Sequence, residues 1–417
     1  MALASWHFRS RWSSDQCQNP DTNRNPSTGT LTDSILKKME GFHQANTALS
    51  MDIFKKFTEQ RKTENFIFSP ICLSYSLALG FKGSKGNTAT EIEKVLHFEK
   101  VKDYDFGFQT LNSDICKISA TLPLKVVKRL YVDSSFNCTK EFINSTKKPY
   151  PSELEIIDIK TRAEEARNQI NASIKELTDG HMQNLLSEGL LNENTNMLML
   201  GSAYFKGCWL YKFNESETKE GVFHINKTET KPIQMMQLEA RLSIRSIKEL
   251  NLVILDIPFA GKHISMLILM SKNTEDDSAG LEKLEQDLTL ENYLNWTNPS
   301  MMANSKVKLT LPKFKIESSY DLKDNLRSLG INDAFDEEVA DFSGMSETKG
   351  LSISQAMYNA GIDITEDGTE TADVTKERYL MPKTECNVDH PFLFLIRHKK
   401  TQSIFFCGRY CCPEASC

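Results

Sequence analysis

The sequence predicts a single α+β domain, because helical and strand patterns mix along the chain without strict strand–helix–strand alternation. Its 417 residues would suffice for roughly two or three domains. No internal repeat and no glycine–serine linker divides the chain, so we assign residues 39–413 to one domain. The hydrophobic content of 40% and the charged content of 25% are ordinary for a globular protein, which excludes wholesale disorder.

The two ends of the chain differ from this domain. Residues 1–38 are rich in polar residues and show little apolar periodicity, so we predict a disordered N-terminal extension. Residues 414–417 form a short tail. From Met39, an apolar stripe that includes Phe42 and Leu49 predicts the first helix of the domain.

The next elements are a strand at Asn65–Phe68 and an apolar helix at Ile71–Phe81. We expect the Ser69 side chain to cap that helix, and Pro70 suits the first helical position, where no backbone donor is needed. After a break that contains glycine, Thr88–Val95 begins another helix.

Helices and strands also alternate through the rest of the chain. Ala163–Leu186 predicts an amphipathic helix and a second short helix, with a break at Thr178–Gly180. Lys323–Leu329 predicts a short helix that ends at Gly330. The predicted strands are Met197–Leu200, Val222–Ile225, Leu252–Ile257, Ile264–Leu269, Val307–Leu311, Phe392–Arg397 and Ile404–Cys407.

No segment predicts a membrane span. The most apolar runs, Ile264–Met270 and Phe392–Ile396, are far shorter than the roughly 20 residues that a bilayer requires. They are typical of strands that are covered on both faces. Arginines and serines interrupt the first twenty residues, so no signal peptide is expected.

Charge and cysteine usage exclude two further classes of protein. The 50 basic and 56 acidic residues give a net charge of −6, which argues against a dedicated nucleic-acid binder. The ten cysteines form no C-x-x-C pair, so the sequence does not predict a zinc site, and we expect free thiols in a reducing compartment. Six N-x-[ST] sequons matter only if the chain follows the secretory route.

The sequence contains no complete catalytic motif of the kinds considered below. Gly83–Thr88 superficially resembles a phosphate loop but lacks the adjacent Gly-Lys-Ser/Thr, and a turn between two helices explains it. Asp363–Gly368 echoes the start of a calcium loop, but Val374 occupies the position of the bidentate glutamate. There is no G-x-S-x-G or H-E-x-x-H motif. We therefore predict no enzyme activity, no cofactor and no metal site.

A set of segments in order resembles the serpin family. These segments are Asn65–Pro70, Gly83–Thr88, Ile170–Leu186, Ala203–Trp209, Val307–Ile316, Asp341–Ser346, Glu366–Glu370 and Asp389–Phe394 through Gly408–Arg409. The resemblance covers Met39 to Pro413. Within the family, the chain resembles the intracellular-type, ovalbumin-like branch. It implies about nine helices packed on three β-sheets, with an exposed reactive-centre loop at about residues 366–389. A second set resembles one member of that branch in particular: His97–Asp103, Gly107–Thr110, Lys128–Asp133, Glu215–Glu220 and Phe342–Gly350.

Inhibitory serpins act by inserting the cut loop into the main sheet as a new strand. By this resemblance the loop hinge consists of Glu366, Gly368, Thr369, Glu370, Thr371, Ala372 and Asp373. If Thr369 faces inward, Asp373 and Glu377 also enter the sheet interior, since alternate residues of a strand share a face. Each buried carboxylate costs several kcal/mol unless it is paired or protonated. The other register buries Glu370, Lys376 and Arg378. Both registers would bury charged side chains, so both oppose insertion of the loop into the sheet.

The length of the loop argues the same way. The usual bait position falls at Pro382–Lys383, a poor site for trypsin-like enzymes. The basic candidate for the scissile bond, Arg378–Tyr379, comes earlier, and about eleven residues of strand span only about 36 Å. That distance is too short to carry a protease across the body.

The sheet-opening region resembles the family at Ser69 but differs at Cys72, Gly201 and Tyr358, where the family usually has Ser, Asn and His. One interpretation is a core repacked by volume. The other, which we favour because it agrees with the loop chemistry, is relaxed selection for sheet opening.

The lead hypothesis is a non-inhibitory serpin that acts as a binding and regulatory protein in epithelial cell adhesion, migration and growth control. We expect a cytoplasmic monomer, and unconventional secretion would place some of the protein in the extracellular space. The candidate partners are extracellular-matrix or cell-surface proteins. The alternative is a serine-type endopeptidase inhibitor with Arg378 as bait. A third hypothesis is a glycosaminoglycan or collagen binder that uses Lys117, Lys125, Lys128 and Arg129. For these four residues we favour a plainer interpretation, a solvated helix face and strand edge.

Overall fold

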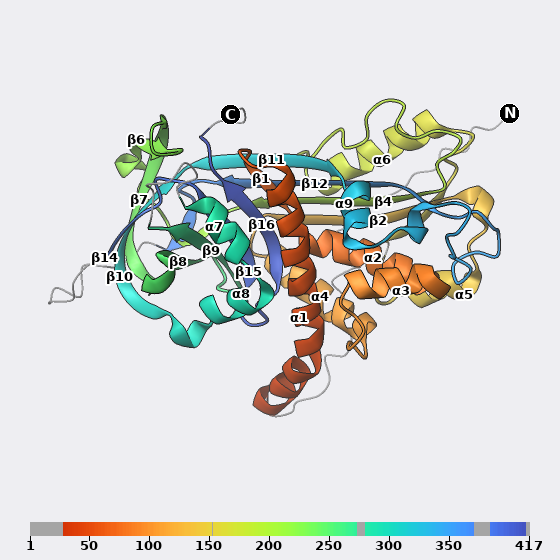
Figure 1. Cartoon of the computed structure of the whole chain (residues 1–417), viewed down its shortest axis with the longest axis horizontal. Helices are drawn as coiled ribbons and strands as arrows, with labels where there is room; N and C mark the ends of the chain where they lie inside the picture. The colour runs from red at the N-terminus through yellow and green to blue at the C-terminus, as the bar shows by residue number, and fades with distance from the viewer. Residues whose placement is uncertain (1–27, 152, 273–279, 371–383, 414–417) are drawn as a thin grey trace.

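The computed structural model describes residues 28–151, 153–272, 280–370 and 384–413. Within these residues the chain forms nine α-helices and three β-sheets, as the sequence predicts (Figure 1). The helices are α1 Thr28–Gln60, α2 Pro70–Gly83, α3 Gly86–Val95, α4 Tyr104–Ser119, α5 Lys140–Thr146, α6 Ala163–Leu177, α7 Leu281–Asp287, α8 Leu290–Trp296 and α9 Lys323–Leu329.

Sixteen strands join these helices within the described residues. They are β1 Phe66–Phe68, β2 Leu124–Asp133, β3 Leu154–Ile157, β4 Met197–Lys206, β5 Trp209–Tyr211, β6 Lys219–His224, β7 Thr230–Ile247, β8 Leu252–Pro258, β9 Ile264–Ser271, β10 Ala303–Pro312, β11 Phe314–Asp321, β12 Ile353–Ile364, β13 Gly368–Glu370, β14 Thr384–Asn387, β15 Phe392–His398 and β16 Ile404–Tyr410. All eight strands that the sequence predicts are present.

A five-stranded sheet has the strand order β11-β12-β4-β2-β3. Helix α2 covers one face and α6 covers the other (Figure 1). Two separate apolar clusters fill these interfaces, because successive side chains of a strand point to opposite faces. The inner strands β2 and β4 are therefore buried on both faces, whereas the edge strands β3 and β11 are partly exposed.

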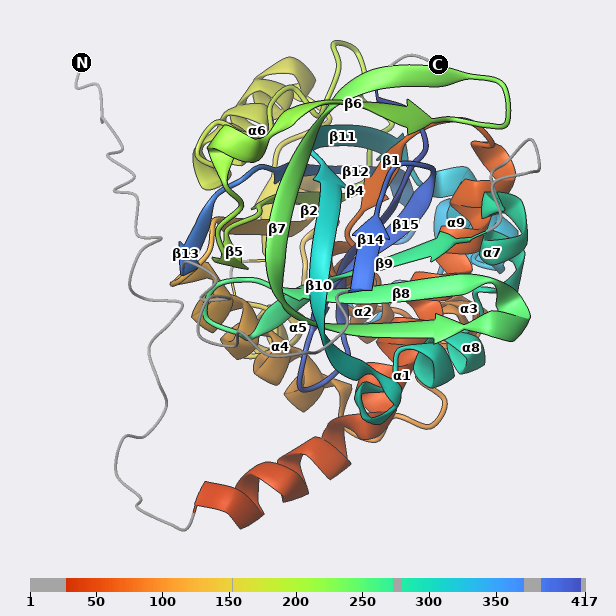
Figure 2. The ribbon, with the colours of Figure 1, turned by 90° about the vertical axis from the view of Figure 1, so that its left-hand side faces the viewer.

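A nine-stranded sheet forms the other half of the body, with β14 at one end next to β10 (Figure 2). Its strand β7 is 18 residues long and pairs in turn with β6, β10 and β8. Strands β9 and β15 are buried along their whole length, so the interpretation of their apolar runs as covered strands is confirmed.

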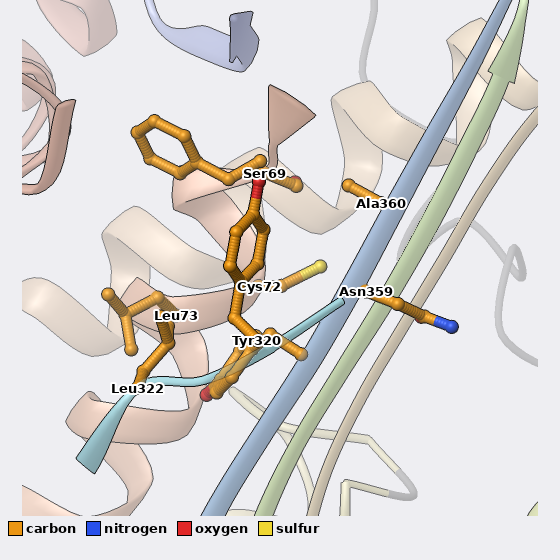
Figure 3. Close-up of a pocket in the computed structure, with 9 residues that line it drawn as sticks. Ser69, Cys72, Leu73, Tyr320, Leu322, Asn359 and Ala360 are labelled. Carbon is orange, nitrogen blue, oxygen red and sulfur yellow. The ribbon is translucent and has the colours of Figure 1, made fainter. Parts of the chain in front are cut away.

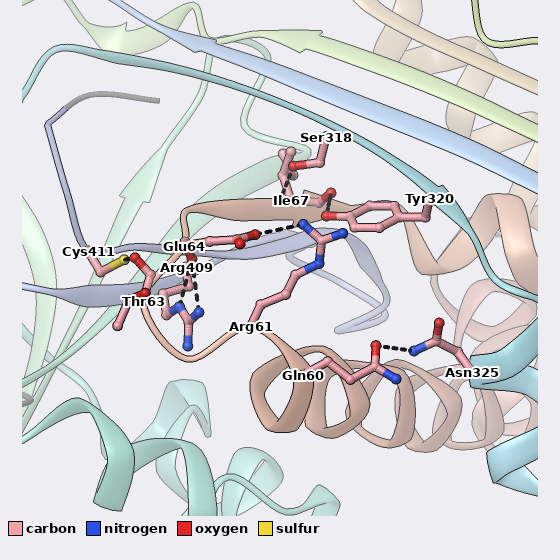
Figure 4. Close-up of polar contacts among 10 residues, drawn as sticks. All are labelled: Gln60, Arg61, Thr63, Glu64, Ile67, Ser318, Tyr320, Asn325, Arg409 and Cys411. Carbon is pink, nitrogen blue, oxygen red and sulfur yellow. Dashed lines mark hydrogen bonds and ion pairs between the residues drawn. The ribbon is translucent and has the colours of Figure 1, made fainter. Parts of the chain in front are cut away.

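The short strand β1 joins the two sheets. It pairs with β16 of the nine-stranded sheet, while its residue Ile67 contacts β11 of the five-stranded sheet (Figure 4). The backbone N–H of Ile67 donates to Ser318 Oγ at 3.3 Å, and its carbonyl accepts from the Tyr320 hydroxyl at 3.0 Å. Side-chain hydrogen bonds thus connect the two layers just before α2 begins.

The first helix begins earlier than the sequence predicts. Helix α1 starts at Thr28, so it includes residues 28–38, which we expected to be disordered (Figure 2). Once the packed residues from Met39 onward have formed a helix, each further residue adds one hydrogen bond without a new nucleation cost. Residues 1–27 of the predicted extension lie outside the described residues.

The second short helix expected near Leu186 is wrong. Helix α6 ends at Leu177, and Asp179 and Gly180 adopt positive φ angles of 51° and 81°, which terminate a helix. The Asn171 side chain then bonds both the N–H and the carbonyl of Leu186. These backbone groups are no longer available for a second helix.

The cysteines follow the prediction with one correction. Seven of those in the described residues are free thiols, namely Cys72, Cys116, Cys138, Cys208, Cys386, Cys407 and Cys411. Cys412 is disulfide-bonded, so the expectation of free thiols is wrong for that residue. Among the helices of the described residues, none combines the length and the apolar character that crossing a membrane requires.

Candidate functional site

The predicted sheet-opening residues meet at the boundary between β4 and β12, which we call the β4–β12 seam. These strands are parallel neighbours at the centre of the five-stranded sheet. Their pairing runs from Met197 with Ile353 to Lys206 with Asp363, and it is interrupted by one irregularity after Ile353. In this structure the seam is closed along its length.

Cys72, Gly201 and Tyr358 lie together on the α2 face of the seam. Gly201 and Tyr358 are register partners across the two strands, and Cys72 projects toward them from α2. A Cβ atom on Gly201 would lie 2.3 Å from ring carbons of Tyr358 and 2.8 Å from the Cys72 Cβ. Because Cβ atoms do not approach other atoms that closely, the tyrosine ring at this position requires glycine opposite it.

Ser69 belongs to the same region but does not play the predicted capping role. It occupies the residue before α2, and Pro70 follows in the first turn as expected. Its hydroxyl makes no cap hydrogen bond and instead donates to the Phe405 carbonyl of β16 at 2.9 Å. The hydrogen bond to Phe405 is favoured over a helix cap because that buried carbonyl would otherwise lose a hydrogen bond.

A small cavity of about 10 Å³ lies beside this cluster, with room for about one water molecule (Figure 3). Tyr320 spans it, and its hydroxyl reaches the Ile67 carbonyl. Burial raises the pKa of Tyr320 to about 12 and that of Cys72 to about 11, so both groups stay uncharged at neutral pH. The lining residues are Phe68, Ser69, Cys72, Leu73, Tyr320, Leu322, Tyr358, Asn359 and Ala360.

The loop hinge begins at a buried carboxylate. Glu366 is 7% exposed and accepts hydrogen bonds at 2.9 Å from Lys313 Nζ and from the Thr218 hydroxyl. Burial alone would raise the pKa of Glu366, but these hydrogen bonds outweigh it and hold the pKa below its ordinary value. Thr365, the residue before Glu366, is also held in place: its carbonyl accepts a hydrogen bond from the indole N–H of Trp209 at 2.8 Å.

The next hinge residues pair with β5 instead of entering the seam. Strand β13 runs parallel to β5, with Gly368 opposite Trp209. A Cβ on Gly368 would lie 2.5 Å from the backbone of Lys212, so this close approach requires glycine. The Thr369 hydroxyl contacts the Leu210 carbonyl at 3.4 Å. The hinge therefore already has a strand partner outside the five-stranded sheet.

The remaining predicted loop residues lie outside the described residues. They are Thr371, Ala372, Asp373, Glu377, Arg378 and Tyr379. Their assignment as hinge and candidate scissile bond stays a prediction.

The hypothesis of a basic ligand surface is wrong for two of its four residues. Lys128 is 8% exposed, pairs with Glu153 at 2.8 Å and lies 3.9 Å from the centre of the Tyr75 ring. Arg129 is 5% exposed and pairs with Glu155 at 2.9 Å. The plainer interpretation as a solvated edge is wrong here too, because β2 lies between β4 and β3.

The other two cations of that set remain closer to solvent. Lys117 pairs with Asp114 at 3.3 Å and Lys125 pairs with Asp179 at 2.7 Å. All four cations thus have carboxylate partners, which weakens any attraction for a polyanion.

Sequence reasoning missed the residues that hold the two ends of the loop. Lys313 and Thr218 lie far from Glu366 in the chain, so no local pattern indicates their contact. At the other end, Asp389 and His390 contact β6 and β9. Within the described residues, no group of three or more histidine, cysteine or acidic side chains is arranged to hold a metal ion.

Comparisons with known proteins find similar sequences and similar structures. The family model described as "Serpin (serine protease inhibitor)" matches residues 44–413. Serpin B5 of Xenopus laevis is 64% identical over 379 residues, which cover 91% of this chain and 99% of that protein.

Two solved structures are also similar. A crystal structure of maspin has a TM-score of 0.88 and 50% identity, over 90% of this chain and 100% of the other. A structure described as a tumour suppressing serpin has a TM-score of 0.85, with the same identity and coverage. Maspin is the member that the second set of segments in the sequence resembles, so that resemblance is confirmed.

Proposed function

The chain belongs to the serpin family, and from this premise we propose that it is a non-inhibitory member that acts by binding other proteins. The packing of Tyr358 against Gly201 and Cys72 carries the proposal, because it lies on the two strands that loop insertion must separate. Separating β4 from β12 would remove the tyrosine ring from the space above Gly201. An inserted strand would have to replace these packing contacts for insertion to be favourable.

The hinge adds a second obstacle. Insertion must first release Glu366 from Lys313 and Thr218, and then strip β13 from β5. Each step breaks contacts that are already formed. The free energy gained when the loop enters the five-stranded sheet as a sixth strand is therefore reduced. The carboxylates of Asp373 and Glu377, predicted to enter the sheet, reduce it further.

The biological role is proposed from the relatives. One similar structure is described as a tumour suppressing serpin, and the other relatives named above are Serpin B5 and maspin. We propose a role in epithelial cell adhesion, migration and growth control, exerted through protein partners at the loop and the body surface. We propose that the protein is a cytoplasmic monomer without catalytic activity, and that some of it leaves the cell unconventionally.

Thermal unfolding of intact and nicked protein tests the proposal. A trypsin-like protease cuts at Arg378–Tyr379, and mass spectrometry verifies the position of the cut. We expect the two midpoints to agree within about 2 °C, because an uninserted loop adds no strand. A gain of tens of degrees, or a covalent complex with the protease that survives SDS, would establish the inhibitor with Arg378 as bait instead.

A matched variant separates the two obstacles. Asp373→Ala combined with Glu377→Ala removes the predicted buried charges and leaves the seam unchanged. If the seam packing suffices, nicking this variant also leaves the midpoint unchanged. A gain seen only in the variant would transfer the explanation from Tyr358 to the loop charges.

A further inference from the structure

Two buried histidines are linked by hydrogen bonds where α1 meets the turn between β15 and β16. His43 of α1 and His398 at the end of β15 are each 7% exposed. The Ser403 hydroxyl lies 2.8 Å from His43 Nδ1, and the Thr401 hydroxyl lies 2.9 Å from His398 Nδ1. The Thr401 hydroxyl also donates to Ser403 Oγ at 3.0 Å. We call these four side chains the His43–His398 chain.

The direction of the hydroxyl bonds assigns the proton on each ring. Because the Thr401 hydroxyl donates to Ser403, the proton of Ser403 is free to bond His43 Nδ1, which accepts. Thr401 Oγ1 then accepts from a proton on His398 Nδ1. A neutral ring carries one proton, so that of His43 lies on Nε2, which is buried and has no hydrogen-bond partner among the described residues. Both rings fit the chain in the neutral form.

A charged ring would have no counter-ion in direct contact. Both rings face neutral hydroxyls, and neither histidine forms an ion pair with a carboxylate in the described part of the chain. Asp114 of α4 favours the charged form of both rings, but it is paired with Lys117 at 3.3 Å. Uptake of a proton by either buried ring therefore costs free energy. The groups that oppose a charge on His398 lie on α4, the β8–β9 turn and the β15–β16 turn, and they are Lys117, His263 and Lys400.

We propose that the His43–His398 chain is an acid-sensitive joint, which holds α1 to the β15–β16 turn while both rings are neutral and weakens when they are protonated. Protonation of His43 Nδ1 converts an acceptor into a donor, so the Ser403 hydroxyl loses its acceptor. Two positive rings would also repel each other. The apolar stripe of α1 stays packed, so we expect a loss of stability and no release of the helix. The joint acts independently of whether the loop inhibits proteases.

Acid should weaken the joint, and neutral pH should keep it intact. Burial, followed by repulsion from His398, lowers the pKa of His43 to about 4, and burial also lowers the pKa of His398. Because the ordinary value is 6.5, the two neutral rings contribute fully to stability above that pH. That contribution is lost as the pH falls through the folded-state pKa values, toward about 4 for His43.

Thermal unfolding between pH 7.5 and pH 5 tests the joint. We expect the unmodified protein to lose about 5 °C more in its midpoint over this range than His43→Leu, because the variant has no ring to protonate at that position. Carboxylate titration is common to both proteins and cancels in the difference. His181→Gln, which alters an exposed ring stacked on Tyr204, should respond as the unmodified protein does. Equal losses in the unmodified protein and in His43→Leu would overturn the joint.

Two further measurements test whether the rings act as one unit. His43→Leu and His398→Gln should each reduce the pH response. The double variant should reduce it by less than the sum of the two, because each single variant also removes the repulsion between the rings. Nitrogen NMR of the unmodified protein at pH 7.5 should find the proton of His43 on Nε2 and that of His398 on Nδ1. Responses that simply add, or the same tautomer in both rings, would show that the two histidines are not linked.

Discussion

The β4–β12 seam has two unlike faces. On the α2 face, Tyr358 packs tightly over Gly201. On the α6 face, the register partners Ser202 and Asn359 are 0% and 5% exposed, and neither Ser202 Oγ nor Asn359 Oδ1 has a hydrogen-bond partner in the described part of the chain. A buried polar atom without a partner carries an uncompensated desolvation cost. Resistance to parting therefore resides in the packing of the α2 face.

The α2 face is where we propose that this chain departs from an inhibitory serpin. The backbone ladder between β4 and β12 is shared by both faces and does not distinguish them. Each face contains buried polar atoms without a hydrogen-bond partner among the described residues, namely the Tyr358 hydroxyl on one face and Ser202 Oγ and Asn359 Oδ1 on the other. What distinguishes the α2 face is the large ring of Tyr358, which packs against Gly201. A change on the α2 face should thus affect stability far more than a change on the α6 face.

Removing the ring should produce the largest effect. We expect Tyr358→Ala to lower the free energy of unfolding by about 3 to 5 kcal/mol, the usual cost of deleting a buried aromatic ring. Urea denaturation measures the change. A loss under about 1 kcal/mol would show that the ring does not hold the seam.

Gly201→Ala provides the matched control. Alone it should cost about 1 to 3 kcal/mol, because the new Cβ overlaps the Tyr358 ring. In the Tyr358→Ala background the same change should cost almost nothing, because the space is then open. If the two penalties simply add, the two residues are not coupled and the packing argument fails.

Much of the fold can be predicted from the sequence because its signals are local. Lys323–Leu329 is a helix with the predicted bounds, and Gly330 ends it at a φ of 116°. The length of α1 was missed because helix propagation extends beyond the apolar stripe.

The site is harder to predict, because it depends on residues that are distant in the chain. Cys72, Gly201 and Tyr358 were found only through the family resemblance, and their contact needed the structure. The Ser69 hydroxyl donates to the Phe405 carbonyl and does not cap the helix that follows it. Burial of Lys128 beside Glu153 likewise follows from sheet order, which no local pattern encodes.

A change at Glu366, in the loop hinge, should have an intermediate effect on stability that depends on pH. Glu366 has a pKa held below its ordinary value of 4.5, so its contribution to stability is present above pH 4.5 and is lost as the pH falls through the folded-state pKa. Glu366→Gln should cost about 1 to 2 kcal/mol at pH 7, and the difference from the unmodified protein should shrink below pH 4.5. Thermal unfolding across pH measures both. The control Glu220→Gln, at an exposed position on β6, should show neither effect.

The smallest effect should come from the α6 face. Ser202→Ala removes a buried hydroxyl that has no hydrogen-bond partner among the described residues, so we expect the free energy of unfolding to stay unchanged or to rise by up to about 1 kcal/mol. Ser74→Ala is the matched comparison, because Ser74 is 1% exposed but its hydroxyl donates to Asn46. That variant should lose about 1 kcal/mol in urea denaturation. If Ser202→Ala loses as much as Ser74→Ala, the α6 face contains a hydrogen bond that holds the strands together. The contrast between the two faces would then no longer explain why the seam stays closed.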